Sequence, residues 1–414
     1  MTDAEQSHVD QAKSKMLGLD DMGAGAVSHQ TGVTLELLQG AQNLVKYARI
    51  GEAQEVAILA SRGQHEDVIN ALVIASEEQG AHVTVIETRG RTERHAFPGL
   101  REEPPRVLRQ ALKGADIFID AGIGPLYAVG ARHVDREYMK VARSEYGAIF
   151  IRSEMLSREV MASEFGRLPC DVVYEIGRRV LSIVEQGKAM RVTTPLGTDI
   201  SFEINPRGIM GSFRPLNMPG DMLAIPGGRV GLNPEHGYGI LYSEAVNPKV
   251  EPPYTFMTKP IKIVWDDNWA VEISGEGEST EWLSNLIDRR GDRNARWWGE
   301  CMFGIHPKSN AFGYPTEDVE VYFTGLHSRP DTLHNALGHS AGAGGVVSNL
   351  HIDTFVHDQT VYVDGEKLID DGHLLVLDDP GIREFASRYG DPDDLLRMDP
   401  MPEGLFKCER GNHA

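Results

Sequence analysis

The sequence predicts an N-terminal α/β domain with a parallel sheet, followed by a C-terminal, mainly antiparallel α+β domain that carries a metal site. Its 414 residues exceed what one small hydrophobic core usually holds, so two domains are expected. In the first half apolar runs alternate with amphipathic helical segments, which is typical of parallel sheets. In the second half glycine, proline and short alternating strands dominate instead.

Residues 1–50 are predicted to form a helical N-terminal segment, because the apolar residues of 34–50 suit a helix better than a strand. The apolar run 55–61 then predicts a strand. An amphipathic helix over 66–80, closed by Gly80, and a second strand over 82–88 complete a βαβ unit. The α/β domain therefore begins near residue 51.

Residues 104–116 predict another helix, and 117–123 and 147–154 predict two further buried strands. A long helix over 171–187 closes the domain, which we place at residues 51–189. No GxGxxG motif follows the first strand, and GIGPLYAVG at 122–130 has the wrong spacing for one. A nucleotide site in this domain is therefore not expected.

Residues 190–414 form the second predicted domain. The sequence AMRVTTPLGTDISFEI (189–204) alternates like a hairpin that turns at 195–197. Further strands are predicted at 262–267, 269–275, 319–325, 351–357 and 360–377.

The composition excludes several classes of partner. The formal charge of −20 argues against nucleic acid or an anionic membrane, since both reward clustered lysine and arginine. No run approaches the roughly 20 apolar residues of a membrane span, and the N-terminus lacks the apolar core of a signal peptide. A cytoplasmic protein with a small-molecule substrate is expected.

The three cysteines are far apart, so neither a disulfide framework nor a thiolate metal site is predicted. Cys301 is a nucleophile or, more commonly, a buried apolar thiol.

The segment NLHIDTF (349–355) carries the clearest chemical pattern. Side chains alternate along a strand, so His351 and Asp353 share one face. Glu300 stands among aromatic and apolar neighbours in RWWGECMFGIHP, and His334 stands in TLHNALGHSAG. Asp221 follows Pro219 and Gly220. A carboxylate in an apolar setting is costly unless a positive charge compensates it, so together these groups indicate a cation.

Each residue alone also has a structural explanation. Glu300 could cap a helix or pair with Arg296, His334 could be a solvated helix residue, and Asp221 could belong to a turn. As a set, histidines and carboxylates without cysteine suit Zn, Mn, Co or Fe(II). Five nearby histidines are set aside, namely His306, His327, His339, His357 and His373.

The motifs RWWGECMFGIHP, TLHNALGHSAG and NLHIDTFVHDQTVYVDGEKLIDDGHLL resemble the metal-binding segments of thermophilic-type aminopeptidases (the aminopeptidase T and S group) and of their relative 2,5-dihydroxypyridine 5,6-dioxygenase. The resemblance runs from about residue 50 to 380. It implies that Asp221, Glu300, His334, His351 and Asp353 are metal ligands. It also implies a homodimer.

Two departures bear on the reaction that the resemblance implies. The aminopeptidases have a glutamate where this chain has Asp221, and a catalytic tyrosine near the place of Ala341. The dioxygenase relative has a histidine where this chain has Glu300, and a histidine in its α/β half. The only acid–base candidate in the corresponding segment here is Tyr127.

The sequence therefore predicts a divalent-metal-dependent hydrolase of a small amide, amine or heteroaromatic substrate. Asp221 or Glu300 would accept a proton from metal-bound water. Trp297, Trp298 and Phe303 would contact the substrate, unless they belong to the core. One alternative is an Fe(II)-dependent dioxygenase that opens a dihydroxypyridine-type ring in aromatic catabolism, with an iron site from His334, His351 and either Glu300 or Asp353. A second alternative is a non-catalytic binding protein that retains the fold.

Overall fold

The computed structural model describes most of the chain. The described residues are 32–61, 66–88, 110–111, 113–121, 148–153, 157–213, 222–247, 255–309, 325–340, 345–401 and 404–408. Most of the helix predicted at 104–116 and nearly all of the strand predicted at 319–325 lie outside them.

The N-terminal half contains a parallel sheet, as predicted. Its elements are, in chain order, α2 (Leu35–Ala48), β1 (Glu55–Ser61), α3 (Glu66–Glu77), β2 (His82–Thr88), β3 (Ile117–Asp120), β4 (Ile149–Ser153), α6 (Arg158–Ala162), α7 (Glu164–Arg167) and α8 (Cys170–Gln186). The strand order is β2-β1-β3-β4-β8, and every neighbouring pair is parallel. Residues 56–60 of β1 are buried on both faces because β1 lies inside this sheet, whereas β2 lies at its edge.

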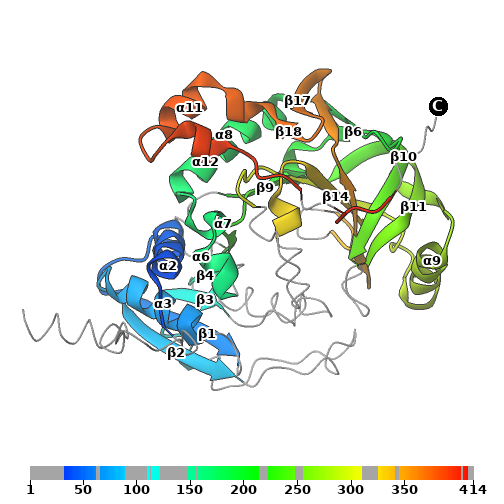
Figure 1. Cartoon of the computed structure of the whole chain (residues 1–414). Coiled ribbons are helices and arrows are strands. Elements are labelled where there is room, and N and C mark those ends of the chain that lie inside the picture. Colours follow the sequence, from blue (N-terminus) through cyan, green and yellow to red (C-terminus); the bar gives the residue numbers. More distant parts are fainter. Residues whose placement is uncertain are drawn as a thin grey trace, which may run out of the picture.

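Three helices lie close to their predicted ranges of 34–50, 66–80 and 171–187, namely α2, α3 and α8, whereas residues 1–31 of the predicted N-terminal helical segment lie outside the described residues. The side chain of Thr34 caps α2 by accepting a hydrogen bond from the backbone N–H of Leu37, 3.3 Å away. The apolar face of α2 packs on α3, α6 and α7, and α3 packs on β1 and β2 (Figure 1). The long helix α8 leads out of this half toward the antiparallel sheet.

The remaining elements build mainly a large, curled antiparallel sheet (Figure 1). They are β5 (Ala189–Thr193), β6 (Asp199–Ile204), η5 (Pro206–Gly208), β7 (Met210–Ser212), β8 (Met222–Ile225), β9 (Arg229–Leu232), β10 (Pro234–Asn247), β11 (Thr255–Asp266), β12 (Trp269–Ser274), α9 (Glu278–Arg290), β13 (Trp298–Gly304), β14 (Thr332–Gly338), β15 (His351–His357), β16 (Thr360–Val363), β17 (Glu366–Asp370), β18 (His373–Leu374), η7 (Leu375–Asp378), α11 (Pro380–Ala386) and α12 (Pro392–Leu396). The strand β8 joins the parallel sheet beside β4. The hairpin predicted at 189–204 is confirmed as β5 and β6.

The order of the antiparallel sheet places β14 and β15 in its interior. It runs β18-β17-β16-β5-β6-β10-β15-β14-β13-β9-β7, with β11 and β12 paired beside β10. All seven residues of β14 and the first six of β15 are buried. Polar side chains on these strands therefore face a protein interior, where each needs a partner.

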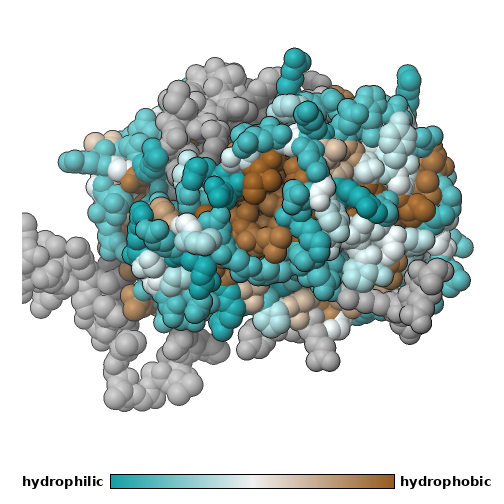
Figure 2. Space-filling view, turned by 90° about the horizontal axis from the view of Figure 1, so that it is seen from above, coloured by the Kyte–Doolittle hydropathy of each residue, from teal (hydrophilic) through white to brown (hydrophobic). Residues whose placement is uncertain are grey.

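The face of the molecule seen from above is mainly hydrophilic in the residues that are coloured, and its teal side chains surround an apolar area (Figure 2). A pocket of about 370 Å³ lies between η7, α11 and α12 and is lined by His373, Leu377, Asp378, Arg383, Asp393, Leu396, Arg397 and Met398. Across the described ranges, no helix combines the length and the apolar character that crossing a membrane requires.

Candidate metal centre

The register of three neighbouring strands brings two acidic side chains to one face. Glu300 of β13 lies opposite Ala336 of β14, and Ala336 lies opposite Asp353 of β15. Residues directly opposite in an antiparallel sheet point to the same side, so the small Ala336 stands between two carboxylates. A longer side chain at this position would extend between the two carboxylates.

Two histidines flank this row on the same face. His334 precedes Ala336 by two positions on β14, and His351 precedes Asp353 by two positions on β15. Because side chains alternate along a strand, both imidazoles point to the side of the carboxylates. The pattern read from the segment 349–355 is therefore realised in the structure.

A third imidazole comes from outside the sheet. His327 lies among the helical residues 325–328, just before β14. The side chain of Thr332, at the start of β14, donates hydrogen bonds to the carbonyl oxygens of Leu326 and Arg329 and fastens the turn over the strand. The guanidinium of Arg329 pairs with the carboxylate of Asp331, with one N–O distance of 2.7 Å. These contacts hold His327 above β14.

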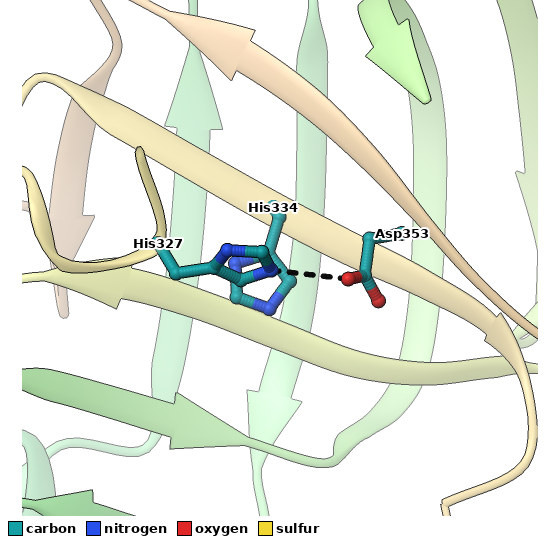
Figure 3. A group of neighbouring side chains, drawn as sticks. All are labelled: His327, His334 and Asp353. Carbon is teal, nitrogen blue, oxygen red and sulfur yellow. Dashed lines mark hydrogen bonds and ion pairs between the residues drawn. The ribbon is translucent and has the colours of Figure 1, made fainter. Parts of the chain in front are cut away.

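The five side chains form one compact group, which we call the five-residue cluster: Glu300, His327, His334, His351 and Asp353. His327 Nε2 lies 3.1 Å from Asp353 Oδ2, and His351 Nε2 lies 2.7 Å from Asp353 Oδ1. Glu300 reaches toward the other two sides, 3.5 Å from His334 Nε2 and 3.9 Å from His351 Nε2. Figure 3 shows the contact between His327 and Asp353, and the ring of His334 lies next to that of His327, with centroids 4.5 Å apart.

The protonation of His351 is constrained by its backbone neighbour. Nδ1 of His351 lies 2.7 Å from the carbonyl oxygen of His339. A carbonyl oxygen only accepts hydrogen bonds, so this nitrogen carries the proton and donates it. In the neutral ring, Nε2 therefore presents a lone pair toward the carboxylate of Asp353. This is the arrangement in which outer contacts orient metal-binding histidines.

The donor set fits a divalent cation. One atom each from His327, His334 and Asp353 lies within 4.8 Å of the other two. The group gathers imidazole lone pairs and two carboxylates, and it contains no lysine or arginine. Neighbouring ligands of an ion with bonds of about 2.1 Å stand roughly 3 Å apart, close to the two shorter distances given above. A cation would therefore relieve the repulsion among these acceptors and compensate the buried negative charge.

The structure places most of the residues that the sequence singled out. Glu300, His334, His351 and Asp353 meet as predicted. Glu300 and His334 lie on strands, so the helix-cap and solvated-helix alternatives are wrong. Arg296 lies 3.6 Å from Asp288 as an ion pair. Asp221 and Tyr127 lie outside the described residues.

His327 is not among the ligands that the sequence predicts, but the structure includes it in the cluster. The signal was its position seven residues before His334, with Ser-Arg-Pro-Asp of 328–331 forming a turn between them. The other four histidine side chains make different contacts. His339 Nδ1 accepts a hydrogen bond from the backbone N–H of Ser348, 3.1 Å away, although its backbone carbonyl contacts His351. His306 packs on Phe165, His357 binds Glu244, and His373 binds Asp378.

Residues beside the cluster have structural roles. Cys301 is fully buried on the opposite face of β13, and burial raises the pKa of its thiol, which argues against a nucleophile. Trp298 and Phe303 are fully buried core residues, and Trp298 stacks on Trp265. They do not form a substrate wall.

Comparisons with known proteins identify relatives of this fold. A sequence model of the 2,5-dihydroxypyridine 5,6-dioxygenase family, NicX, matches residues 36–376. The structure of 2,5-dihydroxypyridine dioxygenase from Pseudomonas putida KT2440 superposes with a TM-score of 0.65 at 17% identity, covering 82% of this chain and 96% of that one. Wild-type AmpT from Thermus thermophilus superposes with a TM-score of 0.54 at 17% identity, covering 82% and 99%. No curated protein sequence matches the chain significantly.

These comparisons correct the predicted reaction. The prediction of a metal-dependent hydrolase is wrong, because the family match favours the alternative, a ring-opening dioxygenase. The hydrolase prediction rested on ligand segments that resemble those of the aminopeptidases and on the lack of a counterpart, near Tyr127, to the histidine in the α/β half of the dioxygenase. One fold supports different chemistries, so these features do not fix the reaction. The chain belongs to the 2,5-dihydroxypyridine 5,6-dioxygenase family.

Proposed function

We propose that this protein is an Fe(II)-dependent dioxygenase that opens the ring of a hydroxylated pyridine. The observation that carries the proposal is the composition of the group formed by His327, His334 and Asp353. Two imidazole nitrogens and one carboxylate oxygen are the ligand set of non-haem Fe(II) oxygenases. These three residues would hold the ion, and His351 and Glu300 would complete the walls of the site.

The chemistry assigns separate tasks to the metal and to the protein. When bound, Fe(II) supplies the one-electron chemistry that lets O2 react with a closed-shell aromatic ring, and it keeps positions open for ligands other than protein. The protein binds the ring and moves its protons. Both atoms of O2 enter the product as one ring bond breaks, so no external reductant is consumed.

Glu300 is the side chain best suited to accept a proton from a ring hydroxyl. Its side chain is 12% exposed, against 1% for Asp353 and 5% for His351. Loss of that proton makes the ring more electron-rich, and therefore more reactive toward O2. Positioned carboxylates act as general bases when they lie within hydrogen-bond reach of the proton.

Asp353 and His351 have an orienting task. The two oxygens of Asp353 face different imidazoles, His327 on one side and His351 on the other. The backbone carbonyl of His339 holds the ring of His351 in turn. This fixed arrangement keeps the polar groups pointing inward without reorganisation during turnover.

The cellular setting belongs to the same proposal. Three free, buried cysteines suit a reducing compartment such as the cytoplasm. A homodimer stays a prediction from the family resemblance.

The test is O2 uptake by protein loaded anaerobically with Fe(II), with 2,5-dihydroxypyridine as the first substrate. We expect one O2 consumed per ring opened, with no turnover when O2 is withheld. His334→Ala should abolish uptake, whereas His373→Ala, an exposed histidine that binds Asp378, should not. Absence of O2 uptake by Fe(II)-loaded protein across mono- and dihydroxylated pyridines would contradict the proposal.

A further inference from the structure

The C-terminal strap, defined as residues 397–401 and 404–408, lies beyond the matched family region, which ends at residue 376. In Figure 1 it continues from α12 toward β10 and β11. Polar contacts fasten it at both ends. The backbone carbonyl of Asp399 accepts a hydrogen bond from Arg329, 3.1 Å away, and its carboxylate lies 3.8 Å from Nζ of the buried Lys308. Cys408 donates to the carbonyl oxygen of Met257 at 3.3 Å.

The middle of the strap packs on a small apolar cluster that is separate from the main core. This cluster contains three buried residues, Ala245, Leu326 and Phe355. Three side chains of the strap pack against it: Met401, Leu405 and Phe406. Leu326 directly precedes His327, so the strap packs against the segment that carries a proposed metal ligand.

Phe355 also contacts two histidines of the five-residue cluster. Its ring lies edge-on to His327, with centroids 5.0 Å apart, and lies 5.5 Å from the ring of His334. Phe355 is fully buried. It therefore connects the apolar cluster under the strap with two proposed ligands.

Phe406 has a second, directional contact. Its ring stacks on His357 with centroids 4.2 Å apart and planes only 8° from parallel. Nδ1 of His357 lies 2.7 Å from the buried carboxylate of Glu244. His357 follows Phe355 on the same face of β15, so Phe406 is fixed beside Phe355.

We propose that Phe406 is a positioning residue for the metal centre, acting through Phe355 and Leu326 on His327 and His334. The inference rests on the proposed metal site but not on the reaction at that site. Removing the ring of Phe406 opens space behind Phe355 and Leu326, and closely packed interiors relax into such space. The two imidazoles then lose their backing. Loss of the hydrogen-bonding partners of metal ligands weakens metal binding by about 10–100-fold, and we expect loss of the packing behind the ligands to act at the lower end of this range.

The experiment measures Co(II) binding by the full chain, by chelator competition and by the visible ligand-field spectrum. We expect Phe406→Ala to weaken Co(II) binding about tenfold and to alter the spectrum. Phe406→Tyr keeps the stacked ring and should retain both properties of the unchanged chain. Leu396→Ala is the matched control, because Leu396 is a buried C-terminal residue of the main core and not of the cluster around Phe355.

The outcomes separate a positioning role from a merely structural one. Positioning is supported when both Phe406→Ala and Leu396→Ala lower the melting temperature but only Phe406→Ala weakens Co(II) binding. Unchanged Co(II) affinity and spectrum in folded Phe406→Ala overturns it. If Phe406→Ala does not fold, Phe406→Leu replaces it in the same comparison. We then expect a smaller decrease in Co(II) affinity. Co(II) binding by Phe406→Leu at the strength of the unchanged chain would contradict the inference. O2 uptake is not used, so failure of the proposed reaction would be seen separately.

Discussion

His327 Nε2 and Asp353 Oδ2 lie 3.1 Å apart although the residues are 26 positions apart and belong to a helical turn and a strand. The contact joins His327, which lies outside the sheet, to a site whose other members lie on β13, β14 and β15. It makes two imidazoles and a carboxylate converge, which is the arrangement on which the proposed ferrous site depends.

Replacement of His327 by alanine should reduce Fe(II) affinity by at least tenfold, because one of three nitrogen and oxygen donors is lost. Metal content after dialysis against a limiting chelator measures this. His373→Ala provides the comparison, since that histidine binds Asp378 away from the cluster. Equal metal content in the two variants would remove His327 from the site.

The sequence predicted four of the five members of the cluster and missed the fifth for a physical reason. His351 and Asp353 follow from alternation along one strand, which is a local rule. His327 lies outside the sheet, and its direction is set by the turn at 328–331 and by the contacts of Thr332. Such tertiary contacts leave no periodic pattern in the sequence.

Ala336→Val should abolish metal binding while the chain still folds. Valine is favourable in strands, but here its branches would fill the space between Glu300 and Asp353. The overpacking cost should be about 1–3 kcal/mol. Ala270→Val, at a buried position of β12, tests overpacking elsewhere. Isothermal titration with Fe(II) under argon checks this, and metal binding by Ala336→Val at wild-type strength would show that the ion does not lie above this row.

Glu300→Gln should lower kcat by about 100-fold or more, since the amide keeps the shape of the side chain but does not accept the proton of a ring hydroxyl. Fe(II) affinity should change less than it does in His327→Ala. Stopped-flow turnover with a fixed, saturating Fe(II) load separates the two effects. A kcat equal to that of the unchanged enzyme would assign the proton transfer to another group.

The fold was predicted more completely than the site. The βαβ unit of β1, α3 and β2 and the hairpin of β5 and β6 follow from local periodicity and turn residues. The sequence did not show that β8 leaves the antiparallel half to pair with β4. That pairing joins segments about 70 residues apart, and hydrophobic periodicity carries no information on which strands become neighbours.

Stability should decrease in mild acid because of His306. This residue is fully buried, and burial lowers its pKa from 6.5 to about 3. Between pH 6.5 and pH 3 the imidazole binds a proton in the unfolded chain but not in the folded chain. The free energy of unfolding therefore has its full value, as far as His306 is concerned, above pH 6.5, and it decreases as the pH falls toward 3. The loss is at most about 1.4 kcal/mol per pH unit.

In the unchanged chain, the backbone N–H of Lys308 donates a hydrogen bond to His306 Nδ1, 3.2 Å away. His306→Asn removes the titrating imidazole but keeps a side-chain acceptor for this N–H. Urea unfolding of the metal-free proteins at pH 7 and pH 5 measures the effect. The unchanged chain should lose more free energy of unfolding than the variant over this interval. Identical losses would mean that His306 does not remain neutral in the folded state.

The most direct test of the central claim is anomalous diffraction at the iron edge from crystals of the protein loaded with Fe(II) without oxygen. We predict an iron peak within bonding distance of the imidazoles of His327 and His334 and of the carboxylate of Asp353. Iron bound away from the cluster, or held by His351 and Glu300 with His327 turned away, would contradict it.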